Sequence, residues 1–302
     1  MSLINTGSFS KALWPGVNRW YGKEYNDYAT EYDKIFEKRT SNRAFEEDVS
    51  VSSFGLAYIK PEGSPIVYDT ERQGWITRYQ HTVFALGFII TREVMDDDQY
   101  DIVGQRKAQG LARSIRQTKE INGANIFNRA FNGVYTGGDG VSMINAAHPN
   151  VKGGTFSNQL TVASDLSEAA LEQAHIDIAA FQDDAGLLIA ARPKTLVIPR
   201  QLVFEARRIL GSDLRVGTTN NDLNALKDMG VVQNTVVNHY LTDPDAWFLL
   251  TDIKGGPSYF ERRPDEFAME NEFDTENAKF KATSRYSFGW SDPRGVFGSP
   301  GA

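Results

Sequence analysis

The residues that could carry out chemistry are few and lie far apart in the chain. The four histidines, His81, His148, His175 and His239, occur singly and show no metal-binding spacing such as HExxH. We expect His175 to pack on the apolar side of a helix and His148 to belong to a structural turn. The chain contains no cysteine, which excludes disulfides, thiolate metal sites and cysteine nucleophiles and fits a reducing compartment. We therefore expect neither a metal nor a cofactor.

Two other segments could form sites, and both have plainer explanations. Gly137-Gly138-Asp139-Gly140 superficially resembles a phosphate-binding loop, but no Lys-Ser/Thr pair follows it and Met143 stands where a dinucleotide fingerprint needs its third glycine. A turn is expected there. Asp96–Asp98 could bind a cation, yet carboxylates also suit the positive end of a helix dipole. No nucleophile elbow is present. The sequence therefore does not predict an enzyme, and a hydrolase or ligand-binding protein is a remote alternative.

Size and charge limit the remaining classes of protein. A chain of 302 residues suits one large domain or two connected ones, with roughly 75% of its unfolded surface buried. The net charge of −7 argues against a dedicated nucleic-acid binder, but it allows a container that encloses DNA without sticking to it. The longest apolar stretch, Val83–Ile90, is well short of the ~20 residues of a membrane span. Neither a signal peptide nor a membrane partner is expected.

The first part of the chain predicts a helix followed by a projecting hairpin. Apolar residues repeat at helical spacing over Tyr25–Glu37. Strand-like composition then covers Val49–Ile59, Ile66–Tyr68 and Trp75–Ile90, separated by turn-forming clusters. Since an isolated hairpin is marginally stable in water, this one is expected to rest on another subunit.

A long helix and a compact second unit follow. Asp96–Phe131 lacks proline and has helical periodicity, which predicts a rod of ~54 Å. After a glycine- and asparagine-rich loop, Ser167 is expected to cap the next helix. The later elements expected are a helix over Glu168–Asp183, a strand within Pro193–Pro199, a helix that begins at Pro199 and runs to Leu210, a polar loop over Gly211–Asn224, and a strand over Val231–Val237. The end of the chain, Ala246–Phe297, is expected to be β-rich, with alternating stretches such as Phe280, Ala282, Ser284, Tyr286 and Phe288.

Aromatic residues crowd the N-terminal segment, where they include Trp14, Trp20 and Tyr21. These rings either pack back on their own domain or form an arm that packs on a neighbour, because exposed aromatics mark interfaces. On the second interpretation, deletion of Trp14–Trp20 leaves a folded subunit that does not assemble normally.

The order of elements, together with four local segments, resembles a known family. The segments are INAAHPNVKGGTFSN (Ile144–Asn158), RPKTLVIPRQLVFEARRIL (Arg192–Leu210), NHYLTDPDAWFLLTD (Asn238–Asp252) and SRYSFGWSDPRGVFGS (Ser284–Ser299). Together they resemble the Hong Kong 97-type major capsid proteins of tailed bacteriophages, and among these the gpT-like head proteins of Mu-like phages. Encapsulin-type nanocompartment shells share this fold and are the main alternative.

The resemblance implies an α+β fold and a division of the chain into an N-terminal arm and helix (1–48), an extended β-hairpin loop (49–82), a peripheral domain (83–160 and 240–302) with a spine helix (96–131), and an axial domain (161–239). It implies hexamers and pentamers that form an icosahedral head shell around double-stranded DNA. A separate scaffolding protein, a portal and a possible decoration protein are the implied partners. The implied location is the virion, after assembly in the cytoplasm of the host bacterium.

The resemblance also implies where subunits meet. The arm, the hairpin and the polar loop of the axial domain supply the candidates for inter-subunit contacts: Trp14, Trp20, Tyr21, Lys60, Glu62, Arg72, Trp75, Gly217, Asn220, Asn221 and Asn224. Some relatives cross-link a hairpin lysine to an asparagine of the next subunit. Lys60 is the lysine in this hairpin, but the sequence identifies neither its partner nor a catalytic carboxylate.

Overall fold

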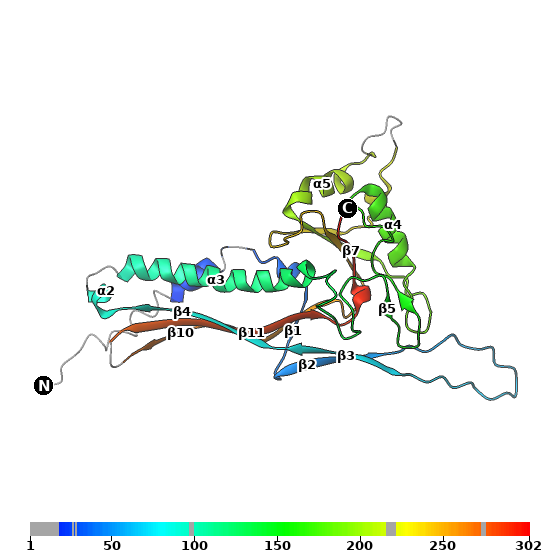
Figure 1. The fold of residues 1–302 in the computed structure, drawn as a ribbon, viewed down its shortest axis with the longest axis horizontal. Coiled ribbons are helices and arrows are strands. Elements are labelled where there is room, and N and C mark those ends of the chain that lie inside the picture. The colour runs from blue at the N-terminus through cyan, green and yellow to red at the C-terminus, as the bar shows by residue number, and fades with distance from the viewer. Residues whose placement is uncertain (1–17, 26, 28, 97–99, 216–221, 273–275) are drawn as a thin grey trace.

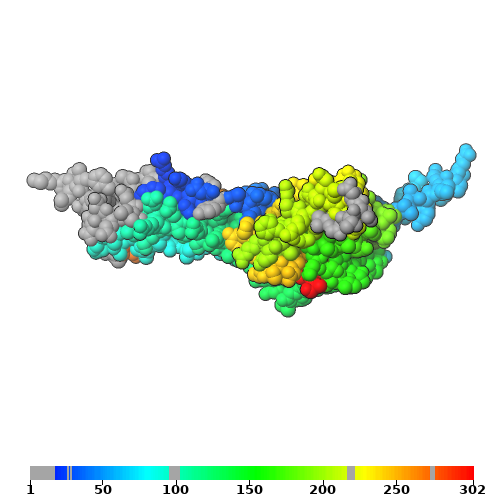
Figure 2. Space-filling model, turned by 90° about the horizontal axis from the view of Figure 1, so that it is seen from above, coloured from blue at the N-terminus to red at the C-terminus, as the bar shows by residue number. Residues whose placement is uncertain are grey.

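The protein is long and flat, with a second unit at one end and a thin hairpin beyond it (Figures 1 and 2). The computed structural model describes residues 18–302 except 26, 28, 97–99, 216–221 and 273–275. Residues 18–25 are helical. The elements that follow are η2 (Tyr32–Lys34), β1 (Glu37–Thr40), β2 (Phe45–Val51), β3 (Gln73–Gln80), β4 (Thr82–Ile90), α2 (Arg92–Asp96), α3 (Tyr100–Asn128), β5 (His148–Pro149), β6 (Thr155–Phe156), α4 (Glu168–Ala179), β7 (Pro193–Pro199), η3 (Arg200–Leu202), α5 (Val203–Gly211), α6 (Ala225–Asp228), β8 (Asn234–Asn238), β9 (Trp247–Thr251), β10 (Pro257–Asn271), β11 (Ala278–Trp290), η4 (Pro293–Gly295) and β12 (Val296–Ser299).

A long sheet forms the flat part of the molecule. Its strand order is β1-β10-β11-β4, with β1 parallel to β10 and the other neighbours antiparallel. The alternation expected in β11 is confirmed, because Phe280, Ala282, Ser284 and Tyr286 are all buried on one face. Phe280 and Ala282 pack there against apolar residues of α3, and this contact holds the helix along the sheet (Figure 1).

The spine helix is confirmed, with different ends. The observed α3 has 29 residues, which corresponds to about 43 Å. It ends at Asn128, three residues before the expected Phe131, and the chain turns there. Asp96 is the last residue of the short α2, so it does not lead the spine; Asp97 and Asp98 lie outside the described residues. No helix in the described part of the chain is long and apolar enough to span a bilayer.

The helix expected over Tyr25–Glu37 is wrong. The chain is helical before this range, then forms the single turn η2, and enters β1 at Glu37. The buried carboxylate of Glu120 on α3 accepts the backbone N–H groups of Glu31 (2.9 Å) and Tyr32 (3.0 Å). Tertiary hydrogen bonds thus replace those of a helix, while Tyr32 still reaches the core.

The second unit has its own sheet, in the order β12-β9-β7-β8. β9 and β12 come from the range 240–302 that was expected to be peripheral, yet both join the sheet of β7. Ser167 caps α4 by accepting the N–H of Ala170, as expected, although the helix ends at Ala179. η3 separates Pro199 from α5, and β8 begins three residues later than expected. The α+β fold is therefore confirmed.

The hairpin has a short paired base and long irregular arms. β2 and β3 pair antiparallel, but β2 ends at Val51 and no strand forms over Ile66–Tyr68. The strand expected over Trp75–Ile90 is two strands, separated at His81. The His81 ring is buried between the hydroxyls of Ser41 and Ser287, and this contact marks the bend where the chain passes from one sheet to the other.

Candidate inter-subunit surfaces

The hairpin is the most exposed part of the described chain. Beyond its base, the hairpin formed by residues 52–72 projects from the body (Figure 2). Ile59 is 96% exposed and Tyr68 is 88% exposed, which is unusual for large apolar side chains. The exposed apolar residues between the two strands are Phe54, Leu56, Tyr58, Ile59, Ile66, Val67 and Tyr68. A cluster of this kind marks a surface that another molecule covers.

Contacts at its base hold the hairpin in place. The backbone N–H of Ser52 donates to the carbonyl of Arg72 (2.9 Å), and Lys152 donates to the carbonyl of Ser53 (2.8 Å). Farther out, the N–H of Gly55 donates to the carboxylate of Asp69 (2.8 Å) and lowers the pKa of that carboxyl. Among the expected contact residues, Lys60, Glu62 and Arg72 are exposed here.

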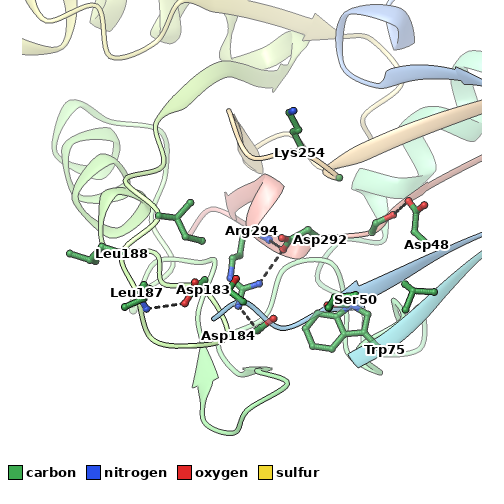
Figure 3. A pocket seen from close by; sticks show the side chains of 16 residues that line it. Asp48, Ser50, Trp75, Asp183, Asp184, Leu187, Leu188, Lys254, Asp292 and Arg294 are labelled. Atoms are coloured by element: carbon green, nitrogen blue, oxygen red, sulfur yellow. Dashed lines mark hydrogen bonds and ion pairs between the residues drawn. The ribbon is translucent and has the colours of Figure 1, made fainter. Parts of the chain in front are cut away.

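A cleft lies where the base of the hairpin meets the loop that precedes β7 (Figure 3). Its volume is about 690 Å³, and the half-buried Trp75 lines it with several aspartates. These carboxylates already have partners inside the chain: Asp48 accepts from Ser291 (2.5 Å), and Asp183 accepts the N–H of Leu187 (2.9 Å). No group of side chains suited to a metal ion occurs among the described residues.

Arg294 joins the segments around this cleft. Its side chain is buried and donates to the carbonyl of Gln182 (2.9 Å), the amide oxygen of Asn150 (2.7 Å) and the carboxylate of Asp184 (3.0 Å). A planar guanidinium can reach all three acceptors at once. The neighbouring Asp292 also pairs with Arg294, but burial dominates and raises the pKa of Asp292. The cleft is therefore a junction between segments that are distant in the sequence.

The N-terminal aromatic residues do not form a wholly free arm. Tyr21 was expected to contact a neighbour, but it is only 6% exposed and its ring stacks on Phe267 with centroids 4.5 Å apart. This is the alternative in which the rings pack on their own domain. Trp20 is half-buried against the same core, and Trp14 lies outside the described residues. Deletion of Trp14–Trp20 would therefore remove core contacts as well as any arm.

Asn224 also has an internal role in place of the expected contact. Its side chain is 3% exposed and accepts the N–H of Lys227 at the start of α6. Its amide nitrogen donates to the carbonyls of Ile209 (2.5 Å) and Ser212 (3.0 Å). The polar atoms of this side chain are thus satisfied within the subunit. The other candidates of this loop, Gly217, Asn220 and Asn221, lie outside the described residues.

The glycine-rich segment forms a turn, as expected, and contains a buried network that the sequence did not predict. The N–H of Gly137 donates to the carbonyl of Val141 (2.8 Å). His148 is fully buried, with Nδ1 2.6 Å from Asp139 and Nε2 3.1 Å from Oδ1 of Asn158. Asn158 donates in turn to three carbonyls, those of Met143, Pro293 and Val296. The network ties this loop to the C-terminal segment, and solvent does not reach it.

The other histidines also make structural contacts. Nδ1 of His239 lies 2.6 Å from Oε1 of Glu31, and the other oxygen of this carboxylate accepts the backbone N–H of His239. His175 lies half-buried in α4, as expected of a packed histidine. His81, His148 and His239 thus act as structural links within the subunit.

A thin, elongated body whose most exposed apolar residues stand on a projecting hairpin is typical of a subunit that builds a larger assembly. Residues 76–298 match the family described as phage capsid protein. The chain belongs to this family of shell proteins, and its role is structural. No curated protein matches it in sequence.

Solved structures share the fold at low sequence identity. The procapsid protein of bacteriophage JBD30 is 13% identical, with a TM-score of 0.54 over 97% of this chain and 75% of that one. The capsid protein of Myoviridae phage XM1 is 9% identical, with a TM-score of 0.53 over 92% and 94% of the two chains. A protein of Mycobacterium phage Patience is 10% identical, with a TM-score of 0.52 over 98% and 88%. The chain thus has the capsid-protein fold expected from its sequence.

Proposed function

We propose that this protein is the major capsid protein of a tailed bacteriophage, and that its copies form the hexamers and pentamers of an icosahedral head shell around double-stranded DNA. The observation that carries the proposal is the hairpin at residues 52–72. It exposes large apolar side chains, up to 96% at Ile59, and no described part of the same chain covers them. Water is a poor solvent for such a surface, so a neighbouring copy is its natural cover.

The shape of the molecule supports the same proposal. A flat sheet backed by one long helix can tile a thin wall, and a unit at one end can meet its equivalents around a symmetry centre (Figure 1). In this arrangement the unit that contains α4 and α5 is axial, the sheet with α3 is peripheral, and the loop before Asn224 lies near the five- and six-fold centres.

The charge of the chain fits a container. A net charge of −7 does not favour tight binding to the phosphate backbone, so the shell encloses DNA without reading its sequence. Within the proposal, the partners other than the protein itself are a separate scaffolding protein, a portal and possibly a decoration protein. The subunits assemble in the cytoplasm of the host bacterium and end in the virion. Membership of the phage capsid family favours this function over an encapsulin-type compartment.

The hairpin rings provide the test. Tyr58→Ser/Tyr68→Ser removes two exposed rings, which are 74% and 88% exposed, and leaves the core untouched. We expect this variant to keep the circular dichroism of the parent but to sediment as small species under conditions in which the parent forms large particles. The matched control, Tyr58→Phe/Tyr68→Phe, keeps the apolar rings and should assemble. Normal particles from the serine variant would contradict the proposal.

A further inference from the structure

One edge of the long sheet lacks the usual protection against pairing. β4 is an edge strand of nine residues, TVFALGFII, with no charge and no proline. Val83, Leu86 and Ile89 are 53%, 48% and 51% exposed. Alternate residues of an edge strand direct their backbone N–H and C=O groups away from the sheet. A long, flat, apolar edge of this kind is a template for another strand, and proteins normally blunt it with charges, proline or a covering segment.

Several other edges of the described sheets are protected in these ways. β1 is short and has the sequence EKRT, and β2 has three consecutive acidic residues. β12 is buried, and Gly298 within it pairs with Gln159. β8 is a five-residue strand with asparagine at both ends. β4 is therefore the longest edge strand without a charge or a proline in the part of the chain that the structure describes.

The arms of the hairpin also lack protection against pairing with another strand. Ser52 and Arg72 share a backbone hydrogen bond, but none joins the two arms between residues 54 and 69. The exception along the arms is the hydrogen bond from the backbone N–H of Gly55 to the side-chain carboxylate of Asp69. The first arm, FGLAYI at residues 54–59, is extended and uncharged, and Leu56 and Tyr58 are both 74% exposed. Unpaired backbone groups next to apolar side chains are suited to β-strand addition.

We propose that residues 54–59 of one copy add as an extra strand to the outer edge of β4 of a second copy. This inference rests on the proposed function, because it requires that copies of the chain meet. The two segments lie toward opposite ends of one molecule, so they cannot pair within it (Figure 1). Both are uncharged, so pairing them buries no charged group and satisfies backbone groups on both sides.

A hollow beside β4 has room for the side chains of the added strand. It is about 680 Å³ and is lined by apolar and charged residues of three strands, among them Gly87 and Ile89 of β4, Ala268 and Glu270 of β10, and Lys279 and Lys281 of β11. Gly87 has to stay small, since a Cβ there would lie 2.5 Å from the carbonyl oxygen of Phe280. Strand β4 thus lies close to β11 at this position, and the hollow has room for an aromatic ring such as that of Tyr58.

The absence of cysteine makes a cross-linking test direct. Tyr58→Cys is combined in turn with Val83→Cys, Leu86→Cys or Ile89→Cys, assembled particles are oxidised, and the products are separated without reductant. Paired strands bring some Cβ atoms within disulfide range, so at least one combination should give covalent chains of subunits. The control is Tyr58→Cys with Lys38→Cys, which places the second thiol on the opposite edge of the same sheet, and it should remain monomeric.

Each other result has a defined meaning. Cross-linking of particles that carry the Lys38→Cys control would overturn the inference. Cross-linking of particles with Leu86→Cys alone would also overturn it, because β4 would then pair with the β4 of another copy.

Hydrogen exchange on the unmodified protein gives a check without variants. Alternate amides of residues 82–90 should exchange at least tenfold more slowly in particles than in free subunits, and unchanged exchange would overturn the inference. Particles that show neither the cross-link to β4 nor the slower exchange would contradict this inference but not the proposed capsid function. If the chain forms no particles, both proposals are wrong.

Discussion

The ammonium nitrogen of Lys119 lies 2.6 Å from Oδ2 of Asp265, and these side chains are only 3% and 11% exposed. Lys119 belongs to α3 and Asp265 to β10, so the pair joins the spine helix to the sheet. The hydroxyl of Tyr25 donates to the same carboxylate and adds the N-terminal segment to the junction. Burial, with the charge of Asp265, raises the pKa of Tyr25, so this hydroxyl remains protonated.

Loss of one partner of this pair should be costly. Lys119→Met leaves the Asp265 carboxylate buried without its cation, and we expect the free energy of unfolding of the unassembled subunit to fall by about 3 kcal/mol. Urea denaturation measures this change. The control is Arg208→Met, which removes an exposed ion pair with Glu205 and should cost about 0.5 kcal/mol or less. Equal effects from the two variants would show that the buried pair has no special role.

Arg294 should be needed for the junction at the cleft. Arg294→Ala removes three hydrogen bonds and leaves Asp184 buried without its cation, so a loss of about 3 kcal/mol is expected in urea denaturation. Arg294→Lys keeps the charge but not the planar geometry and should recover part of the loss. Lys254→Ala, an exposed residue of the same cleft, is the control and should have little effect. A neutral Arg294→Ala variant would refute the role of this arginine.

Tyr21 should behave as a core residue. We expect Tyr21→Ala to lower the free energy of unfolding by about 3 kcal/mol, because its ring is buried against Phe267. Tyr58→Ala removes an equally large ring that is 74% exposed in the single subunit, and its cost should be within about 0.5 kcal/mol. Both are measured on unassembled protein. The reverse order of effects would restore Tyr21 as a contact residue of the arm.

Glu120 should make stability depend on pH. Burial raises the pKa of its carboxyl in the folded state, against the opposing effect of the amides of Glu31 and Tyr32. The stability linked to this shift is fully present below the ordinary pKa of 4.5 and is lost as the pH rises through the raised value. Relative to Glu120→Gln, the wild-type protein should therefore lose stability as the pH rises above about 4.5.

Urea denaturation at several pH values tests this expectation. Asp213→Asn serves as a control of opposite sign, because Lys227 lowers the pKa of Asp213, and the stability linked to Asp213 is lost as the pH falls. A constant difference between wild type and Glu120→Gln across the range would contradict the prediction.

Local patterns predicted the elements whose stabilising contacts are local or periodic. The alternation around Phe280 and Tyr286 predicted β11, and Ser167 predicted the start of α4. A run of buried-type residues between Pro193 and Pro199 predicted the presence of β7. In each case the sequence window contains the cause of the structure, either a cap or a repeated apolar face.

Contacts between distant residues explain what could not be predicted. Glu120 decides that Tyr32 lies in a turn and not in a helix, and the two are far apart in the sequence. Arg294 gathers acceptors from two loops, and no local signal marks it. Asn224 was placed in a polar loop because of its neighbours, whereas it caps α6 by accepting the N–H of Lys227 and donates to the carbonyl of Ile209. The proposed contacts of Lys60, Glu62 and Arg72 remain predictions, since only a neighbouring copy can test them.

Electron microscopy of the purified protein, expressed alone and together with the scaffolding protein proposed above, tests most directly whether copies of this chain form a closed shell. We predict closed icosahedral particles, or sheets and tubes of hexamers, in which the hairpin of each subunit lies on the next. Uniform small particles under both conditions would contradict the account.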